Sequence, residues 1–290
     1  MKEVLICGLN NYLGKRAAAH LANQELHVTA ITRNTELFYS RTSEPVTAQL
    51  YPVDLIRRTG DYDHFQIRHL DAAIYFAQVP TLNDPVHIKL EMVALRNFIE
   101  LVRRQSCWRI TYVARLMDKK HLRPIIDLFN AQQIQYTIVL NNCAVGLGSM
   151  LDNIFKVLEQ QKIVAYVGRI AKIRFQPIAA LDVIRWLQKM LKMDVFTDKV
   201  IELGGPSVVS FRDFFNLYAR FSPDQAPPRT LILPKPLVKA IFTKLYDING
   251  EDFEEFRQVI RYEDIVDNQQ WQQLMPMELT PLEQAIEQDC

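Results

Sequence analysis

The chain lacks several features that would mark particular classes of protein. No apolar stretch among its 290 residues approaches the roughly 20 residues that a membrane-spanning helix needs, so we expect no membrane span. The formal net charge of +1 gives no general attraction to nucleic acid or to anionic lipid. The densest basic stretch, residues 96–123, is interrupted by apolar residues at helix and strand periods, as expected of a solvated face.

Cysteine and histidine are too few and too scattered for a metal centre. The four cysteines (Cys7, Cys107, Cys143 and Cys290) show no metal-ligand spacing, and no third ligand accompanies His64 and His69. The first residues, Met1-Lys2-Glu3, are not followed by the apolar core of a signal peptide. We therefore expect no metal site, reduced core thiols and a cytoplasmic location.

Glycine is scarce, with nine residues, yet two of them bracket the first turn of the chain. The turn reads Gly8-Leu9-Asn10-Asn11-Tyr12-Leu13-Gly14, between an apolar run and a helical pattern over residues 12–22. Strand, glycine turn and helix in this order are typical of a phosphate loop, in which free N–H groups at the helix start face a diphosphate. Asn10-Asn11 stands where a second glycine is usual. Asparagine tolerates left-handed backbone angles, but its side chain occupies space beside the phosphates.

Strand-like runs alternate with helical patterns through the first half of the chain. The runs cover residues 4–7, 27–32, 46–53, 72–77, 108–113 and 135–140, and the later helical patterns cover residues 85–104 and 119–131. Strands that alternate with helices imply parallel crossovers. The pattern predicts an α/β protein with a doubly wound parallel sheet, the Rossmann fold.

The second half is less regular, and it predicts a smaller, mainly helical C-terminal lobe. We expect a dinucleotide-binding domain over residues 1–206, with part of a substrate lobe at about 143–180, and a helical lobe over residues 207–290. Ser210 opens a helix with a capping-box arrangement, and Pro281 stands at the favoured first position of the final helix. Prolines in the segment 222–228 indicate a linker.

In the order of its elements and motifs, the chain resembles the atypical short-chain dehydrogenase/reductases over roughly residues 3–220, in particular their NmrA-like and complex-I-accessory-subunit-like branch. The first turn is similar to the glycine loop of that branch, with Asn11 in place of its middle glycine. The other matching segments are Thr32-Arg33-Asn34, Asp54-Leu55, Ala77-Gln78-Val79-Pro80, residues 133–138, and Gly204-Gly205-Pro206 with Ser210-Phe211. The resemblance implies that a dinucleotide contacts Gly8, Asn10, Asn11, Tyr12, Leu13, Gly14, Arg33, Asp54, Leu55, Ala77, Gln78 and Val79.

Arg33 favours NADP(H) over NAD(H) as the cofactor. Domains specific for NAD place Asp or Glu at the end of the second strand, where the carboxylate binds the ribose 2′-hydroxyl. Here Thr32-Arg33 occupies that position, and no carboxylate is adjacent until Glu36. An arginine pairs instead with the 2′-phosphate of NADP.

The residues expected of an active short-chain reductase are missing. Such enzymes use Tyr-x-x-x-Lys, in which the lysine lowers the pKa of the tyrosine that exchanges a proton with the substrate. Tyr112 is followed four residues later by Leu116, and Val113-Ala114-Arg115 stands where a serine is expected. Lys120 lies two residues from the lysine position of isoflavone-reductase-like relatives. Tyr112 and Lys120 are the catalytic candidates, with Lys119 or a tyrosine from the second half of the chain as alternatives. A solvated lysine is the simpler reading of Lys120.

These observations leave three hypotheses open. The first is an NADP(H)-binding protein with little or no turnover that senses redox state or acts as a scaffold. The second is an NADPH-dependent reductase or epimerase with a non-standard proton donor. The third is an interaction module that has lost the cofactor because Asn10-Asn11 blocks the phosphates. The expected partners are a dinucleotide and an unidentified small-molecule substrate or protein.

Overall fold

The computed structural model describes residues 1–42, 44–161, 163–166, 172–221, 229–234, 237, 241, 244, 246, 248, 250–259 and 265–289. The predicted linker at 222–228 and Cys290 lie outside the described residues. The chain divides into two compact units, of which the first comprises Met1–Asn141, Val183–Glu202 and Gln269–Met277. The second comprises Asn142–Asp182, Leu203–Asn268 and Glu278–Cys290. Independent domains at 1–206 and 207–290 remain a prediction.

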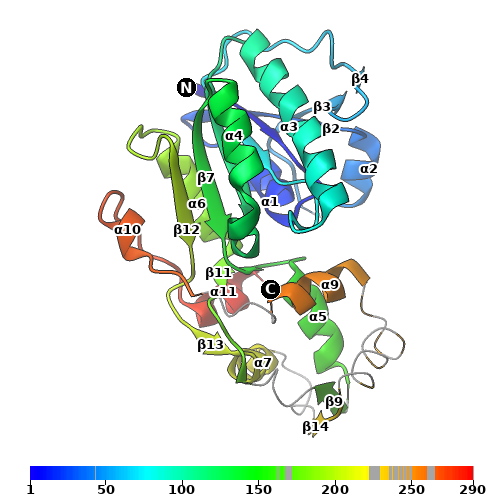
Figure 1. Cartoon of the computed structure of the whole chain (residues 1–290). Helices are drawn as coiled ribbons and strands as arrows, with labels where there is room; N and C mark the ends of the chain where they lie inside the picture. Colours follow the sequence, from blue (N-terminus) through cyan, green and yellow to red (C-terminus); the bar gives the residue numbers. More distant parts are fainter. Residues whose placement is uncertain are drawn as a thin grey trace. The chain divides into compact units, whose positions relative to one another are not determined.

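The first unit is built on an eight-stranded sheet with the order β12-β7-β6-β5-β1-β2-β3-β4 (Figure 1). Neighbouring strands from β7 through β3 are parallel, and β4 is antiparallel to β3. The predicted doubly wound α/β fold is therefore confirmed. The strands are β1 (Lys2–Cys7), β2 (Leu26–Thr32), β3 (Gln49–Asp54), β4 (Thr59–Gly60), β5 (Ala72–Phe76), β6 (Arg109–Arg115), β7 (Gln135–Asn141) and β12 (Lys199–Leu203).

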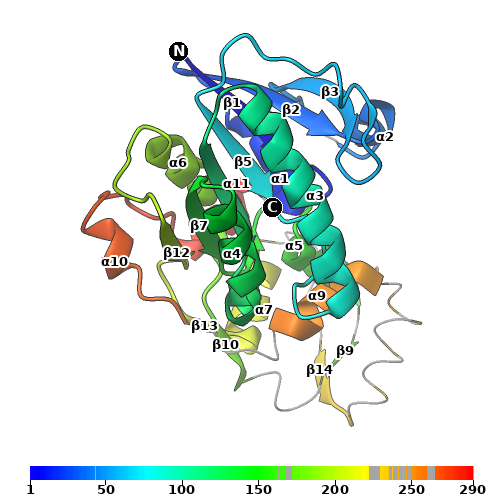
Figure 2. The same ribbon diagram turned by 45° about the horizontal axis from the view of Figure 1, so that its top comes forward.

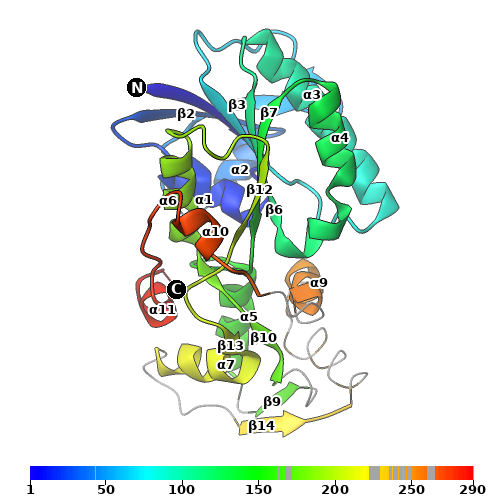
Figure 3. The same ribbon diagram turned by 60° about the vertical axis from the view of Figure 1, so that its left-hand side comes forward.

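Helices cover both faces of this sheet, with α3 and α4 on one face and α1 and α6 on the other (Figure 3). This arrangement buries every residue of β5, as its wholly apolar sequence predicts. Gln188 of α6 donates to the carbonyl of His20 at the end of α1 at 3.0 Å. The helices are α1 (Tyr12–His20), α2 (Thr35–Ser40), α3 (Pro85–Arg104), α4 (Arg123–Ala131), α6 (Ala180–Met190) and α10 (Gln269–Gln272).

The prediction of one continuous helix over residues 119–131 is wrong, because two shorter helices occupy this region. A 3₁₀ helix, η1, covers Leu116–His121, and α4 begins only at Arg123. Pro124 stands in the first turn of α4, where its missing N–H and its fixed φ do no harm. The same residue cannot sit inside a longer helix, so the chain restarts there.

The second unit packs helices α5 (Met150–Glu159), α7 (Phe211–Arg220), α9 (Gly250–Val259) and α11 (Leu282–Asp289) around an aromatic core. Phe155 lies at its centre, with its ring centroid 5.0 Å from that of Phe214. Ser210 caps α7, as predicted, by accepting from the N–H of Asp213 at 3.1 Å. Helices dominate this unit as predicted.

Three short strand pairs complete the second unit. Strand β14 lies beside β9 in parallel (Figure 2), β11 beside β8 in parallel, and β13 beside β10 in antiparallel orientation. Strands β8, β11, β13 and β14 were not predicted from the sequence. The strands are β8 (Ala144–Val145), β9 (Ile163–Tyr166), β10 (Arg174–Phe175), β11 (Ile178–Ala179), β13 (Val209–Ser210) and β14 (Arg229–Ile232).

Among the residues that the structure describes, no helix combines the length and the apolar composition that crossing a bilayer requires.

The turn after β1 can be made only by glycine at residue 8. Gly8 has φ +84°, and a Cβ built on it would lie 2.0 Å from the carbonyl oxygen of Phe76 at the end of β5. A Cβ on Gly14 would lie 2.3 Å from the carbonyl oxygen of Gly8. The two glycines therefore allow α1 to start directly against the ends of β1 and β5.

We predict that Gly8→Ala lowers the free energy of unfolding by about 2–4 kcal/mol, because it combines a left-handed backbone with a backbone clash. The matched control is Gly148→Ala, since Gly148 has φ +75° but no atom lies within 4 Å of its built Cβ. This control should lose only the free energy that a non-glycine residue costs in a left-handed backbone conformation. Urea unfolding of both variants makes the comparison, and equal losses would contradict the steric argument.

Candidate functional site

The candidate site lies at the carboxyl edge of the parallel strands, beside β1. From β1 the chain proceeds to β2 and β3 on one side and then crosses to β5 on the other. The strand order therefore reverses between β1 and β5. In open α/β sheets, ligands bind outside the carboxyl ends of the strands at such a reversal point. The loops that follow β1, β2, β3 and β5 carry all the predicted cofactor contacts.

The turn after β1 is closed by its own asparagine. The N–H of Asn11 donates to the carbonyl of Gly8 at 3.0 Å, and Asn11 then caps α1. Its Oδ1 accepts from the N–H of Leu13 at 2.9 Å. The backbone of Asn11 is extended, with φ −76° and ψ 142°, so its tolerance of left-handed angles plays no part here. Asparagine at this position acts as a helix cap.

The same asparagines join the first turn to the loop after β5. Asn10 donates from Nδ2 to the carbonyl of Gln78 at 2.9 Å, and Asn11 donates from Nδ2 to the carbonyl of Ala77 at 3.1 Å. Both bonds cross the reversal point between β1 and β5. The structure thus brings together two predicted segments that are more than 60 residues apart in the chain. Val79 follows directly, and Tyr12 is the first residue of α1.

Arg33 and Asp54 meet at the ends of β2 and β3. The guanidinium Nε of Arg33 lies 3.6 Å from Oδ2 of Asp54, and the Arg33 side chain is 68% exposed. Asp54 is buried, and its Oδ1 accepts from the N–H groups of Ile56 and Arg57 at 2.8 and 3.0 Å. Leu55 is buried too, and its carbonyl accepts from Asn97 of α3. A buried, hydrogen-bonded carboxylate is therefore paired with an arginine whose side chain is mostly exposed.

Tyr112 lies in the core of the sheet. Its side chain is fully buried, its ring stacks on Tyr75 with centroids 5.6 Å apart, and its hydroxyl donates to Oε1 of Glu91 at 2.9 Å. Burial and the neighbouring Glu91 raise the pKa of Tyr112 well above its usual value. A tyrosine that acts as a proton donor needs a lowered pKa and an open face. Tyr112 has neither.

Lys120 is exposed at the end of η1. Its neighbour Lys119 forms an ion pair with Glu202 at 2.5 Å.

Sequence reasoning missed Glu91, a buried carboxylate that bonds to the loop after β5. It lies on α3, is fully buried, and accepts from the N–H of Gln78 at 3.1 Å through Oε2. Burial raises the pKa of Glu91 to about 7, against hydrogen bonds from Tyr112, Gln78 and Val79 that lower it. One signal was available: Glu91 stands four and seven residues before Leu95 and Phe98, inside the apolar stripe of the helix.

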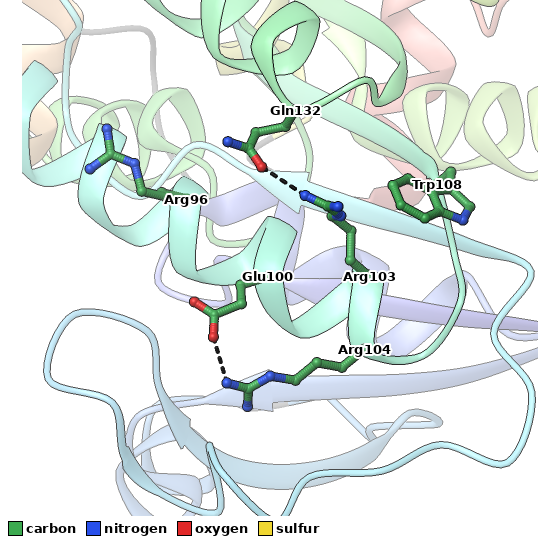
Figure 4. Close-up of a pocket in the computed structure, with 6 residues that line it drawn as sticks. All are labelled: Arg96, Glu100, Arg103, Arg104, Trp108 and Gln132. Carbon is green, nitrogen blue, oxygen red and sulfur yellow. Dashed lines mark hydrogen bonds and ion pairs between the residues drawn. The ribbon is translucent and has the colours of Figure 1, made fainter.

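A surface pocket of about 590 Å³ lies along the C-terminal half of α3 (Figure 4). Three arginines line it, Arg96, Arg103 and Arg104. Arg103 donates to Gln132 at 2.9 Å and lies 4.7 Å from the centre of the Trp108 ring, and Arg104 donates to Glu100 at 2.5 Å. Trp108 precedes β6, so the pocket opens at the amino-terminal edge of the sheet, opposite the candidate site. We assign no ligand to it.

No group of three or more His, Cys, Asp or Glu side chains among the described residues is placed to hold a metal ion.

The fold is similar to that of several solved epimerases. A nucleoside-diphosphate-sugar epimerase from Staphylococcus aureus superposes with a TM-score of 0.68 at 13% sequence identity, over 99% of this chain and 100% of the epimerase. The chain has the epimerase fold. It also matches a UDP-glucuronic acid 4-epimerase from Bacillus cereus, solved with UDP-glucuronic acid and NAD, with a TM-score of 0.60 at 13% identity over 89% and 99% of the two chains.

A UDP-glucose 4-epimerase from Thermotoga maritima, solved with UDP-glucose, gives a TM-score of 0.59 at 13% identity over 89% of this chain and 99% of its own. No family model and no curated protein matches the chain. The resemblance to short-chain dehydrogenase/reductases is therefore confirmed at the level of the fold.

The raised pKa of Glu91 predicts a specific pH dependence of stability. The folded chain keeps this proton to about pH 7, whereas the unfolded chain loses it near the ordinary value of 4.5. Because the folded state binds more protons between these values, the contribution of Glu91 to stability falls as pH rises, by up to about 3 kcal/mol.

Urea unfolding at pH 5 and pH 8 tests this prediction. Relative to Glu91→Gln, the wild-type protein should lose stability between the two pH values. Glu100→Gln, an exposed change on the same helix, should follow the wild type. Parallel curves for wild type and Glu91→Gln would show that Glu91 keeps an ordinary pKa.

Proposed function

We propose that this protein binds a nicotinamide dinucleotide, preferably NADP(H), at the loops after β1, β2, β3 and β5, and acts with little or no turnover as a redox sensor or scaffold. The main support for this proposal is that these loops meet at the point where the strand order of the sheet reverses. There the side chains of Asn10 and Asn11 donate to the carbonyls of Gln78 and Ala77. The Bacillus cereus epimerase with the same fold was solved with NAD.

Each loop has a role in this proposal. The N-terminus of α1 receives the diphosphate, because N–H groups and the helix dipole favour an anion there. The close approach allowed by Gly8 and Gly14 gives the diphosphate access to these N–H groups. Arg33 pairs with the 2′-phosphate, and Asp54-Leu55 lies beside the adenosine. The Ala77–Val79 segment passes along the nicotinamide half.

One residue must move for this fit. The N–H of Leu13 is engaged by Oδ1 of Asn11, so Asn11 has to turn its side chain aside before a phosphate oxygen can accept from that N–H. Losing the cap costs about 1 kcal/mol, whereas a charge-assisted bond from N–H to phosphate returns about 1.5–3 kcal/mol. The exchange favours binding, at reduced affinity.

Weak turnover is supported by the surroundings of the two catalytic candidates. The hydroxyl of Tyr112 is committed to Glu91 in the core, and Lys120 is solvated. No lysine follows Tyr112 at the spacing of the reductase pair. A cofactor that binds but is not consumed suits a protein that reports the NADP(H) state.

The Asn11 cap also supports a second candidate function, an interaction module without cofactor. In this alternative the bond from Leu13 to Asn11 is permanent, and the asparagines simply hold the turn against the β5 loop. The two candidates differ in whether Asn11 gives way to a diphosphate.

We predict that Arg33→Ser weakens NADPH binding about 10- to 100-fold and leaves NADH binding unchanged, since only NADPH carries the 2′-phosphate. Titration followed by nicotinamide fluorescence gives both dissociation constants. Arg41→Ser, a change of another exposed arginine just after α2, serves as the control and should have no effect. Equal losses for NADPH and NADH would place Arg33 elsewhere than at the 2′-phosphate.

Asn11→Gly separates the two candidates. Glycine releases the N–H of Leu13 and costs only a few tenths of a kcal/mol as a helix cap, so NADPH should bind about fivefold more tightly than to the wild type. Calorimetric titration measures the difference. If neither protein binds NADPH at millimolar concentration, the interaction module is the correct reading.

A further inference from the structure

Gln78, in the loop after β5, is hydrogen-bonded on two sides. The carbonyl of Gln78 accepts from Asn10, and its N–H donates to the carboxylate of Glu91, at 3.1 Å to Oε2 and 3.4 Å to Oε1. The N–H of Val79 also bonds to this carboxylate. The loop is thus bonded to the first turn through Asn10 and to helix α3 through Glu91.

Glu91 completes that chain inside the protein. Its Oε1 also accepts from the hydroxyl of Tyr112 at 2.9 Å. The sequence of contacts therefore runs from Tyr112 through Glu91 to Gln78, and from Gln78 to Asn10 of the first turn. Glu91 is the only carboxylate among these contacts, and it has no exposed surface.

From this geometry we infer that Glu91 is a positioning residue of the dinucleotide site: its carboxylate fixes Gln78 in the loop after β5 and, through Gln78, the Asn10 side chain of the first turn. The inference rests on the proposed function for its ligand. The hold on Gln78 itself is a property of the unliganded protein, so it can be tested separately.

The groups that face Glu91 come from four elements. They are Tyr112 of β6, Tyr75 of β5, Cys7 of β1 and Asp118 of η1. Burial raises the pKa of both tyrosines and of the Cys7 thiol, which keeps all three neutral at physiological pH. Asp118 is buried as well, and its Oδ1 accepts from the N–H of Leu82 at 2.8 Å. Glu91 is thus balanced by N–H and O–H donors, with no cation in this set.

Protonation of Glu91 weakens its hold on the loop. The carboxylate is an acceptor at both oxygens, as its bonds to two backbone N–H groups and one hydroxyl require. A carboxylic acid carries a proton on one oxygen, and that proton competes with the N–H of Gln78 for the same space. Because the pKa of Glu91 is raised to about 7, both forms are populated at neutral pH. The loop is therefore held more tightly above pH 7 than below it.

Resonances of the Gln78 amide in the unliganded, ¹⁵N-labelled protein test the hold directly. In the wild type the amide proton shift should titrate between pH 6 and pH 8, and in Glu91→Gln it should stay flat. Glu100→Gln is the control and should titrate like the wild type. A flat Gln78 shift in the wild type would overturn the inference.

Tyr112→Phe gives a second test that does not depend on Glu91→Gln folding. The hydroxyl of Tyr112 lowers the pKa of Glu91, so its removal should move the midpoint of the Gln78 titration to higher pH. A midpoint that stays in place or falls contradicts the chain of contacts described above.

NADPH titrations at pH 6 and pH 8 test the positioning role. The wild type should bind about fivefold more tightly at pH 8 than Glu91→Gln does, and the gap should close at pH 6. Both proteins share the titration of the ligand's own phosphate, so the difference reports Glu91. Equal affinities at both pH values overturn the role. If no variant binds NADPH while Gln78 still titrates, the proposed function fails and the hold on the loop stands.

Discussion

The close approach of the first turn to the end of β5 is the constraint on which the rest of the site depends. Residue 8 lies so near the carbonyl of Phe76 that a single Cβ would meet it at 2.0 Å. This proximity directs the N-terminus of α1 at the point where the strand order reverses. It also brings Asn10 and Asn11 within reach of Ala77 and Gln78. A wider turn would break the bonds from Asn10 and Asn11 to the loop after β5.

Asn11 makes this turn different from an open phosphate loop. An amide oxygen that accepts from Leu13 satisfies a helix N-terminus as an anion would, but without a charge. In the proposed function, a diphosphate therefore has to displace a neutral cap. Charge decides this competition, because a phosphate gains more from the helix end than an amide does. The proposed function therefore implies that Asn11 lowers the affinity for the dinucleotide without closing the site.

The parts that local pattern governs could be predicted from the sequence. Apolar runs that alternate with amphipathic stretches predicted the parallel strands, and Gly8 and Gly14 located the first turn. Long-range packing governs the parts that were missed. Tyr112 stands in the middle of β6, and helices cover both faces of this sheet (Figure 3), so the fold buries its side chain. The position of Glu91 in the apolar stripe of α3 indicates burial, but its bond to Gln78 depends on how the helix packs on the sheet.

Two further details depended on geometry that no sequence pattern gives. The Asn11 side chain could have pointed into the turn or away from it, and its extended backbone places it as a cap. The pairing of Arg33 with Asp54 depends on β2 and β3 being neighbours in register, with Thr32 opposite Pro52. Both details shape the candidate site.

The most direct test of this account is a crystal structure of the protein, from crystals grown with saturating NADPH. The account predicts a diphosphate at the N–H groups of Leu13 and its neighbours, with Oδ1 of Asn11 turned away and the 2′-phosphate beside Arg33. A first turn that stays free of nucleotide, with Asn11 still bonded to Leu13, would contradict it.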